Sequence, residues 1–277
     1  MDELFNDIRF GMRMIRKSPG FASVAILTLA IGIGANAAIF SFVDAVLLKP
    51  LPYPHPEEIV QVWEKPPGYD RNGVSTMNFL DWKNQNSVFR AIAAETGGSV
   101  TLSGGQNPVQ LRGSRVSAPY FDVFGIKPVL GRAFAPDEDQ PGKDQVVVLS
   151  HRIWESRFGA DPGVLGRKIA LDNRPYTIIG ILPANTSFDR RWQDIWTPLA
   201  FQPQDMTRNF HWMRVWARLK PGVSIGTAQQ QMTGIGTRIA KAYPASNKGW
   251  NVKLDLFQDR VVSDQLRSSL WILLAAV

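Results

Sequence analysis

FASVAILTLAIGIGANAAIFSFV, residues 21–43, contains no charged side chain, and apolar character resumes after Asp44. About 20 consecutive apolar residues in a helix are enough to cross the hydrocarbon core of a bilayer. The pattern therefore predicts a transmembrane helix over residues 21–48. Everything that follows it reads as a folded, extracytoplasmic domain, so this one stretch decides the organisation of the chain.

Cations are concentrated on the N-terminal side of this helix. They are Arg9, Arg13, Arg16 and Lys17. On the other side, the nearest cation is Lys49 alone. Because an excess of Lys and Arg marks the cytoplasmic flank of a membrane helix, the N-terminus is predicted to be cytoplasmic. Residues from about 50 to 265 are then periplasmic, with the helix in a bacterial inner (cell) membrane.

Two other interpretations of the apolar stretch stay open. Ala35-Asn36-Ala37 matches the small-x-small pattern of a signal-peptide cleavage site, although the apolar run continues past Ala37. A buried core helix of a water-soluble protein is the second alternative, and the run's length together with its one-sided charge argues against it.

Small residues recur on one face of the predicted membrane helix, at Ala30, Gly34 and Ala38. This spacing lets a second helix approach closely in lipid, although small residues are also simply common in membrane helices. Residues 1–20 predict an amphipathic helix on the cytoplasmic membrane surface, or one packed on a partner protein. Residues 263–277 are predicted to begin a second, truncated membrane helix; the alternative is an apolar element packed in the preceding domain.

The last third of the domain predicts a strand, a helix and a second strand. Residues 213–220 alternate apolar and polar, which is typical of a half-buried strand. Ser224 is predicted to cap a helix with one apolar face, and residues 250–256 alternate again. A similar unit precedes it: a short strand near 59–63, a helix from 76 that Ser75 could cap, and strands near 100–102 and 109–111.

Two such units would pair into one α/β subdomain, interrupted by the segment between them. That segment predicts a buried strand at 146–149, a helix capped by Ser150 and ended by Gly159, and a hairpin around Asp172-Asn173-Arg174. The fold class is therefore α+β. The predicted order is a cytoplasmic helix, a membrane helix, a first part, an insertion, a second part and a further membrane helix, at 1–20, 21–48, 49–112, 113–205, 206–262 and 263–277.

Sequence stretches along the whole chain resemble one known family. They include residues 17–21 (KSPGF), 29–41 (LAIGIGANAAIFS), 47–53 (LLKPLPY), 194–199 (DIWTPL) and 217–222 (ARLKPG). In these stretches the chain resembles the FtsX-like, MacB-type ABC transporter permeases, and in particular the duplicated orphan permeases described from acidobacteria. The resemblance implies a MacB-like periplasmic core, in which a porter-like α/β subdomain is split by an inserted mixed α/β subdomain.

The same resemblance implies a function in efflux, export or lipoprotein-type mechanotransmission. Such permeases transmit cytoplasmic ATP hydrolysis to a periplasmic domain, and three further membrane helices follow that domain. The implied partners are an ABC ATPase subunit, those further permease helices, a periplasmic protein and the lipid bilayer. No cofactor is expected on this chain, since ATP would be bound by the separate ATPase.

The sequence holds no complete catalytic or metal-binding motif, so the chain is predicted not to be an enzyme. No Walker A sequence is present, and none of the 277 residues is cysteine. Gly222-Val223-Ser224-Ile225-Gly226 matches a nucleophile elbow, yet no histidine follows it, and a helix cap is the better interpretation. Asp137-Glu138-Asp139 fails as a calcium loop, because Val148 stands where the bidentate glutamate belongs. The three histidines lack metal-ligand spacing, so catalytic, cofactor and metal sites are all predicted to be absent.

Tryptophans cluster in the sequence at 192, 196, 212 and 216, near several arginines. Exposed, they could form an apolar binding surface; buried, they belong to the core, and the core is favoured. The net charge of +7 does not indicate nucleic acid, since an extracytoplasmic location argues against it. The alternative function is a membrane-anchored extracytoplasmic binding or scaffolding module without an ATPase partner.

Overall fold

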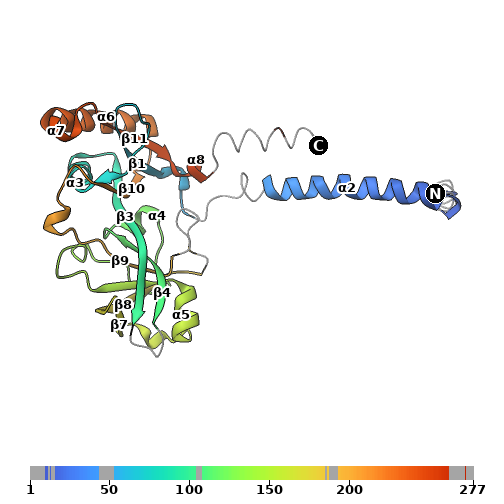
Figure 1. Ribbon diagram of the computed structural model, residues 1–277, viewed down its shortest axis with the longest axis horizontal. Helices are drawn as coiled ribbons and strands as arrows, with labels where there is room; N and C mark the ends of the chain where they lie inside the picture. Colours follow the sequence, from blue (N-terminus) through green and yellow to red (C-terminus); the bar gives the residue numbers. More distant parts are fainter. Residues whose placement is uncertain are drawn as a thin grey trace. The chain divides into compact units, whose positions relative to one another are not determined.

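The computed structural model describes residues 10, 11, 13, 16–43, 53–103, 108–184, 186, 193–261 and 272 (Figure 1). The chain forms two compact units. One comprises Met1–Pro50 with Val262–Val277, and the other is the domain Leu51–Val261. The predicted start of a second membrane helix at 263–277 lies outside the described residues, apart from the helical, exposed Ile272.

Helix α2 (Pro19–Val43) is the apolar stretch identified in the sequence. A proline at its first residue suits a helix start. Backbone N–H groups of the first turn have no acceptor within the helix, so the N–H that proline lacks is not missed there. Pro19–Ser41 has a mean hydropathy of 2.0 and is long and apolar enough to cross a membrane. None of its most apolar stretch is buried within the described residues. A signal sequence near the N-terminus would pass the same test of length and composition.

The first lobe of the domain is an antiparallel sheet in the order β11–β1–β10–β3. Its strands are β1 (Ile59–Lys65), β3 (Phe89–Ser103), β10 (His211–Leu219) and β11 (Asn251–Leu256). Helices α3 (Thr76–Gln85) and α6 (Ile225–Ala242) cover one face. The predicted apolar face of α6, namely Ala228, Met232, Ile235 and Ile239, packs there against Val215 of β10. Both strand–helix–strand units therefore meet in one sheet, as the alternation predicted.

The opposite face of the same sheet is also covered. Short helix α4 (Tyr120–Phe124) packs its aromatic side chains against Ile59, Ala93 and Trp216. Strand β10 is therefore buried on both faces, and the prediction of a half-buried strand is wrong: Trp216 is 0% exposed and Arg218 only 4%. The alternation could not reveal this, because α4 comes from a distant part of the sequence.

The second lobe is a small barrel that is incompletely closed. Strand β3 pairs with β4 (Val109–Val116), β4 with β9 (Ile195–Pro198), and β9 with β6 (Val146–Leu149). Strand β6 then pairs with β8 (Arg174–Ile181), β8 with β7 (Lys168–Leu171), and β7 returns to β3. A separate cluster that includes Leu111, Leu149, Ile178 and Ile195 fills the interior, as side chains do in small barrels.

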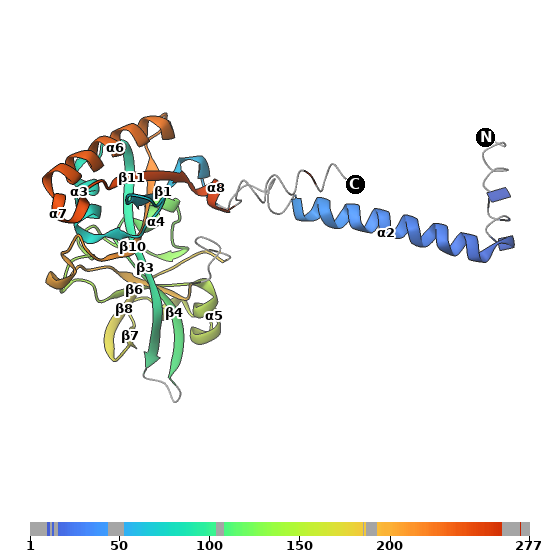
Figure 2. The same cartoon turned by 45° about the horizontal axis from the view of Figure 1, so that its top comes forward.

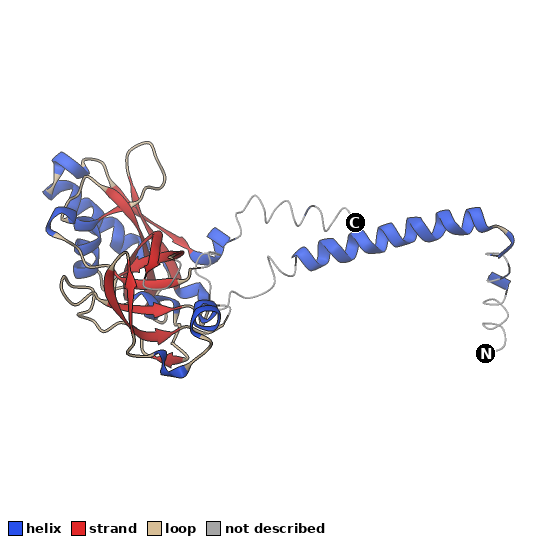
Figure 3. Ribbon diagram, turned by 60° about the horizontal axis from the view of Figure 1, so that its bottom comes forward, coloured by secondary structure: helices blue, strands red, loops and turns tan. Residues whose placement is uncertain are grey.

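The two lobes share β3, a continuous strand of 15 residues. Figure 1 shows α3, α6 and α7 (Pro244–Asn247) at one end of the domain and α5 (His151–Phe158), β7 and β8 at the other. Figure 2 shows β3 running from one end to the other, and Figure 3 shows the strands between the helices. The smaller elements are η2 (Pro56–Glu58), β2 (Val74–Ser75), β5 (Leu130–Gly131), η3 (Pro162–Val164), η4 (Pro203–Asp205) and α8 (Phe257–Val261).

Two of the three predicted helix caps are confirmed. The Ser150 hydroxyl accepts a hydrogen bond from the Ile153 amide, and Gly159 ends that helix at φ 61°. Ser224 accepts one from the Thr227 amide, which makes it a cap rather than a nucleophile. Ser75 is a correction: it precedes α3, but its hydroxyl donates to the Glu64 carboxylate instead of capping the helix.

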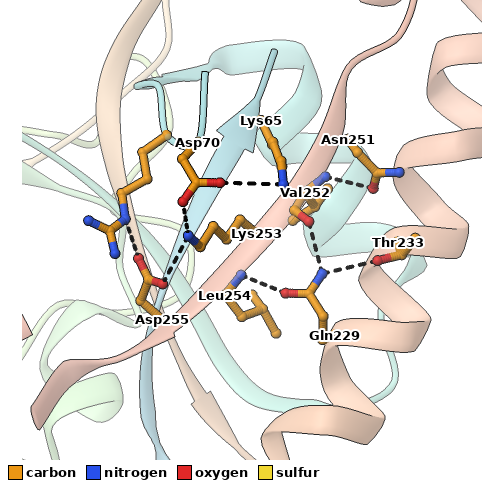
Figure 4. Close-up of polar contacts among 10 residues, drawn as sticks. Lys65, Asp70, Gln229, Thr233, Asn251, Val252, Lys253, Leu254 and Asp255 are labelled. Atoms are coloured by element: carbon orange, nitrogen blue, oxygen red, sulfur yellow. Dashed lines mark hydrogen bonds and ion pairs between the residues drawn. The ribbon is translucent and has the colours of Figure 1, made fainter. Parts of the chain in front are cut away.

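The edge strand β11 is held by α6. In Figure 4, Gln229 of α6 donates to the Val252 carbonyl (2.9 Å) and accepts from the Leu254 amide (2.8 Å). Its side chain thus satisfies backbone groups that an edge strand would otherwise present to another chain. Lys253 of β11 also binds Asp70, and this ion pair, with Lys65, holds the pKa of the exposed Asp70 below its ordinary value.

Candidate functional site

The candidate site lies where the chain enters and leaves the domain. After the apolar helix, the described part of the chain resumes at Tyr53, and α8 is the last element of the domain. We call residues 53–58 the incoming segment. Both ends are fixed onto the same two elements, α4 and β10, so they meet at one place in the fold.

Four aromatic side chains join these ends, and we call them the aromatic junction: Tyr53, Phe124, Trp216 and Phe257. Tyr53 and Phe257 lie 5.5 Å apart by ring centres, in an edge-to-face arrangement. Each also contacts Phe124, at 5.4 and 5.9 Å, and Phe257 lies 5.4 Å from Trp216. All four are buried. Aromatic pairs in this geometry contribute about 0.5–1.5 kcal/mol each beyond area burial.

Arg218 of β10 ties the incoming segment to α4 through four hydrogen bonds. Its Nε donates to the Val123 carbonyl (2.8 Å) and its Nη2 to the Pro54 carbonyl (3.0 Å). Its Nη1 donates to the His55 carbonyl (3.2 Å) and to the Glu58 carboxylate (2.9 Å). Guanidinium is suited to this role, because its donors are arranged in a fixed plane and remain charged.

Close approach of the incoming segment to α4 requires a glycine. Gly125 ends α4 in the left-handed region at φ 66°. A Cβ on this residue would lie only 2.5 Å from Cγ of Pro54. Any larger residue would therefore push the incoming segment off α4.

Glu95 links the aromatic junction to the barrel through hydrogen bonds on both sides. It is 3% exposed, and its Oε2 accepts from the Trp216 indole N–H at 2.9 Å. Its Oε1 accepts from Arg214 (3.0 Å) and from the Ser114 hydroxyl (3.1 Å) of barrel strand β4. Burial, and then the Glu95 charge, raise the pKa of nearby Tyr120 well above its ordinary value. This carboxylate lies on β3 at the last residue that pairs with β10.

A second buried carboxylate, that of Glu64 on β1, connects three strands of the first lobe. Glu64 accepts from the Ser75 amide and hydroxyl (2.8 and 2.9 Å) and from Asn78 (2.9 Å), and pairs with Nδ1 of His211 at 2.5 Å. Serine and histidine both bind the carboxylate rather than each other, so the geometry is not that of an activated nucleophile. His211 also stacks on Trp250 at 4.5 Å. The cluster fastens β2 and β10 to β1.

A cleft of about 670 Å³ lies beside Arg218. Pro54 and Glu58 line one part of it, and Lys83, Arg90 and Lys127 bring cations to it. In the part of the chain that the structure describes, no group of three or more His, Asp or Glu could hold a metal ion. The acidic loop behaves as expected for a surface loop: Glu138 pairs with Arg132 and Asp137 with Lys143.

The residues predicted from the sequence as membrane-related lie apart from this site. Ala30, Gly34 and Ala38 lie on α2 and are exposed. Arg13, Arg16 and Lys17 are helical and exposed, and Arg9 lies outside the described residues. Their packing and flanking roles therefore stay predictions.

Sequence reasoning missed Arg218, Glu58 and Glu95. The sequence offered no signal for Arg218, because it stands at a polar position of an alternating strand. The tryptophan cluster is confirmed as core at Trp196 and Trp216, each 0% exposed, while Trp212 is half-buried and Trp192 lies outside the described residues.

The described residues thus comprise an apolar helix long enough to cross a membrane and a two-lobed α/β domain whose two ends pack together. Comparison with known families makes this specific. Residues 22–235 match the model of the MacB-like periplasmic core domain, so the chain belongs to the family of permeases with that domain. The predicted family and fold class are thereby confirmed.

Individual relatives agree with this assignment. The chain is similar to the macrolide export ATP-binding/permease protein MacB of Burkholderia thailandensis, with 31% identity over 122 residues. That match covers 43% of this chain and 18% of the relative, so it spans less than a fifth of the relative's length.

Two solved structures share the fold. The periplasmic region of MacB from Actinobacillus actinomycetemcomitans superimposes with a TM-score of 0.54 at 15% identity, covering 77% of this chain and 92% of that one. The extracellular domain of the noncanonic ABC-type transporter YknZ from Gram-positive bacteria gives 0.52 at 14% identity, covering 70% and 99%.

Proposed function

We propose that this chain is the permease component of an ABC-type system that transmits ATP hydrolysis by a separate cytoplasmic ATPase to its extracytoplasmic domain. Membership of the MacB-like family supports the permease role. The observation that supports the transmission role is the aromatic junction with Arg218, where both ends of the domain are fixed to one strand.

The contacts supply a continuous route for a displacement. Movement of the incoming segment or of α8 acts directly on Phe124 and Trp216. Trp216 bonds Glu95, and Glu95 bonds Ser114 in the barrel. Protein interiors are close-packed and transmit strain, so a shift at the aromatic junction moves β10, β3 and β4 together. The function expected of this route is mechanical coupling, with nucleotide chemistry left to the partner.

The first experiment is a crosslinked pull-down of the full-length protein from native membranes, read by mass spectrometry. Recovery of an ABC ATPase whose turnover in nanodiscs depends on this protein is the expected result. If no ATPase is recovered and none is stimulated, the transmission proposal is wrong, and the domain is a membrane-anchored binding or scaffolding module.

Coupling is tested in the recovered complex. The 277 residues contain no cysteine, so Gln110→Cys on exposed barrel strand β4 gives this part of the protein one thiol for a fluorophore. We expect an ATP-dependent fluorescence change that Trp216→Phe weakens. Phenylalanine retains an aromatic ring at this position but lacks the indole N–H that donates to Glu95. Arg90→Gln on the exposed side of β3 is the matched control and should leave the signal unchanged. A signal that is equally strong in Trp216→Phe would contradict this route.

A further inference from the structure

One edge of the shared strand β3 is open between the two lobes. Strand β4 follows its first edge from Glu95 to Leu102. Along its second edge, β10 pairs up to Glu95 and β7 pairs only at Leu102 and Ser103. Among the residues that the structure describes, no strand pairs with residues 96–100 on this second edge. The barrel wall is therefore open here.

A pocket of about 380 Å³ occupies this opening. We call it the edge pocket; residues 96–100 of β3, 113–115 of β4 and the β7–β8 hairpin line it, with Ile195 and Thr197 of β9. Its volume falls within the range of about 300–1,000 Å³ that is typical of small-molecule sites, and barrel mouths are a preferred place for them.

Two arginines bring positive charge to the edge pocket. Arg115 and Arg174 line it, and neither forms an ion pair with a carboxylate in the described part of the chain. Arg115 lies 5.8 Å from the Trp212 ring centre, which supports its guanidinium without neutralising it. Asp172 is the acid among the lining residues, and its Oδ1 is engaged by the Thr101 amide at 2.8 Å. The lining therefore carries an excess of positive charge.

The edge pocket also contains hydroxyl groups. Thr96, Ser99, Thr197 and Tyr176 all line the edge pocket. Burial raises the pKa of Tyr176, and the charges of Asp144 and Asp172 act in the same direction, while those of Arg174 and Arg115 oppose them. Both guanidinium groups thus lie within electrostatic reach of the phenol, which remains a neutral hydrogen-bond donor near pH 7.

The pocket wall leaves room for a ligand next to the backbone. Gly97 and Gly98 are adjacent exposed glycines in β3, and glycine within a strand often marks a close approach by a ligand or another backbone. A Cβ built on Gly98 meets no atom within 4 Å. A larger residue at Gly98 would extend into open space without a clash, which makes this position suitable for blocking the pocket.

We infer that the edge pocket binds a small anionic molecule, whose carboxylate or phosphate group is held by Arg115 and Arg174 and hydrogen-bonded by Thr96, Thr197 and Tyr176. Guanidinium recognises both kinds of anion through paired N–H donors. None of the four residues of the aromatic junction lines the edge pocket, although Ser114 of the coupling route does, so binding is measured without ATP and separately from the coupling signal.

The test is isothermal titration calorimetry on the full chain in nanodiscs, with glutarate and glycerol 3-phosphate as separate probes at constant ionic strength. Saturable binding of one probe identifies the anion type. Arg115→Gln and Arg174→Gln are each expected to weaken it about tenfold or more, since each removes charged hydrogen bonds. Gly98→Leu should abolish binding, and Gly98→Ala should weaken it less.

Arg157→Gln is the matched control, because Arg157 is an exposed arginine of α5 outside the pocket. It should bind the probe like the unaltered chain, and equal thermal unfolding midpoints should show that all variants fold. Absence of saturable binding for both probes overturns the inference. So does binding that Gly98→Leu and the two pocket arginine variants leave unchanged.

Discussion

Arg218→Met tests whether the incoming segment is held to the domain by one buried side chain. Methionine keeps an unbranched apolar stem of similar length but removes all four hydrogen bonds. Bonds to a charged donor are worth about 1.5–3 kcal/mol each, yet simple addition would overestimate the effect. The Pro54 and His55 residues are exposed, and the adjoining cleft of about 670 Å³ admits water to their carbonyls.

The cost is therefore set by the groups that water does not reach freely. Val123 is 0% exposed, so its carbonyl remains unsatisfied, at about 1–3 kcal/mol. The Glu58 side chain is 21% exposed and loses its partner in a partly desolvated position. Together these effects predict a loss of about 3 kcal/mol in the free energy of unfolding. For a domain of this size, that corresponds to a fall of about 6–12 °C in the midpoint of thermal unfolding.

The assay is urea unfolding of the full chain in detergent, followed by tryptophan fluorescence and supported by a thermal scan. Arg90→Met is the matched control: it is an exposed arginine lining the same cleft, and its replacement should stay within about 0.5 kcal/mol of the unaltered chain. If Arg218→Met costs no more than this control, the incoming segment is held by something else, and the reasoning is refuted.

Three further changes probe the packing of the domain. Gln229→Ala should cost about 1–2 kcal/mol and speed hydrogen exchange of the β11 amides; unchanged protection of these amides would contradict its role at the sheet edge. Burial raises the pKa of Glu138, but bonds from Arg132 and a backbone amide lower it more, so its folded-state pKa lies below 4.5. Glu138→Gln should thus cost about 1 kcal/mol at pH 7, and this cost should shrink as the pH falls from 4.5 through the lower, folded-state pKa; a pH-independent cost would argue against the ion pair. Gly131 has φ 75°, and Gly131→Ala would place a Cβ 2.1 Å from a carbonyl oxygen of β8, so it should lower the free energy of unfolding by about 3 kcal/mol. Gly142→Ala also has a positive φ, but its Cβ has free space, so it should cost about 1 kcal/mol. Equal costs would show that backbone strain alone decides the effect.

Local signals in the sequence predicted the parts of the fold that local interactions determine. Ser224 caps its helix through a bond to an amide three residues away, and the apolar face of α6 follows the spacing of one helix. The hairpin at Asp172-Asn173 is likewise local, and both residues have positive φ. In each case the physical cause lies within a few residues, so the sequence displays it directly.

Strand β3 shows where this reasoning stops. The sequence predicted a strand only near 100–102, whereas β3 begins at Phe89. Residues 91–94 read AIAA, and Gly97-Gly98 follow, so small side chains hide the alternation. Ala93 and Ala94 are both 0% exposed, because α4 covers one face and the α3–α6 core covers the other. Small residues are needed there by elements that the strand's own pattern does not reveal.

The same limit explains why the candidate site was missed while the membrane helix was not. A membrane helix is specified by its own composition, because lipid is its partner. In the sequence, Arg218 takes a polar position of an alternating strand, and Glu95 follows a run of small residues. What buries these two side chains is the placement of α4, the incoming segment and β4. Period-2 alternation states which residues share a face, but not whether a second layer covers that face. A charged residue on a covered face must be paired with polar groups. Arg218 and Glu95 both find these groups on segments that lie far away in the sequence. Residues that join segments far apart in the chain are therefore the ones that a single sequence is least able to identify.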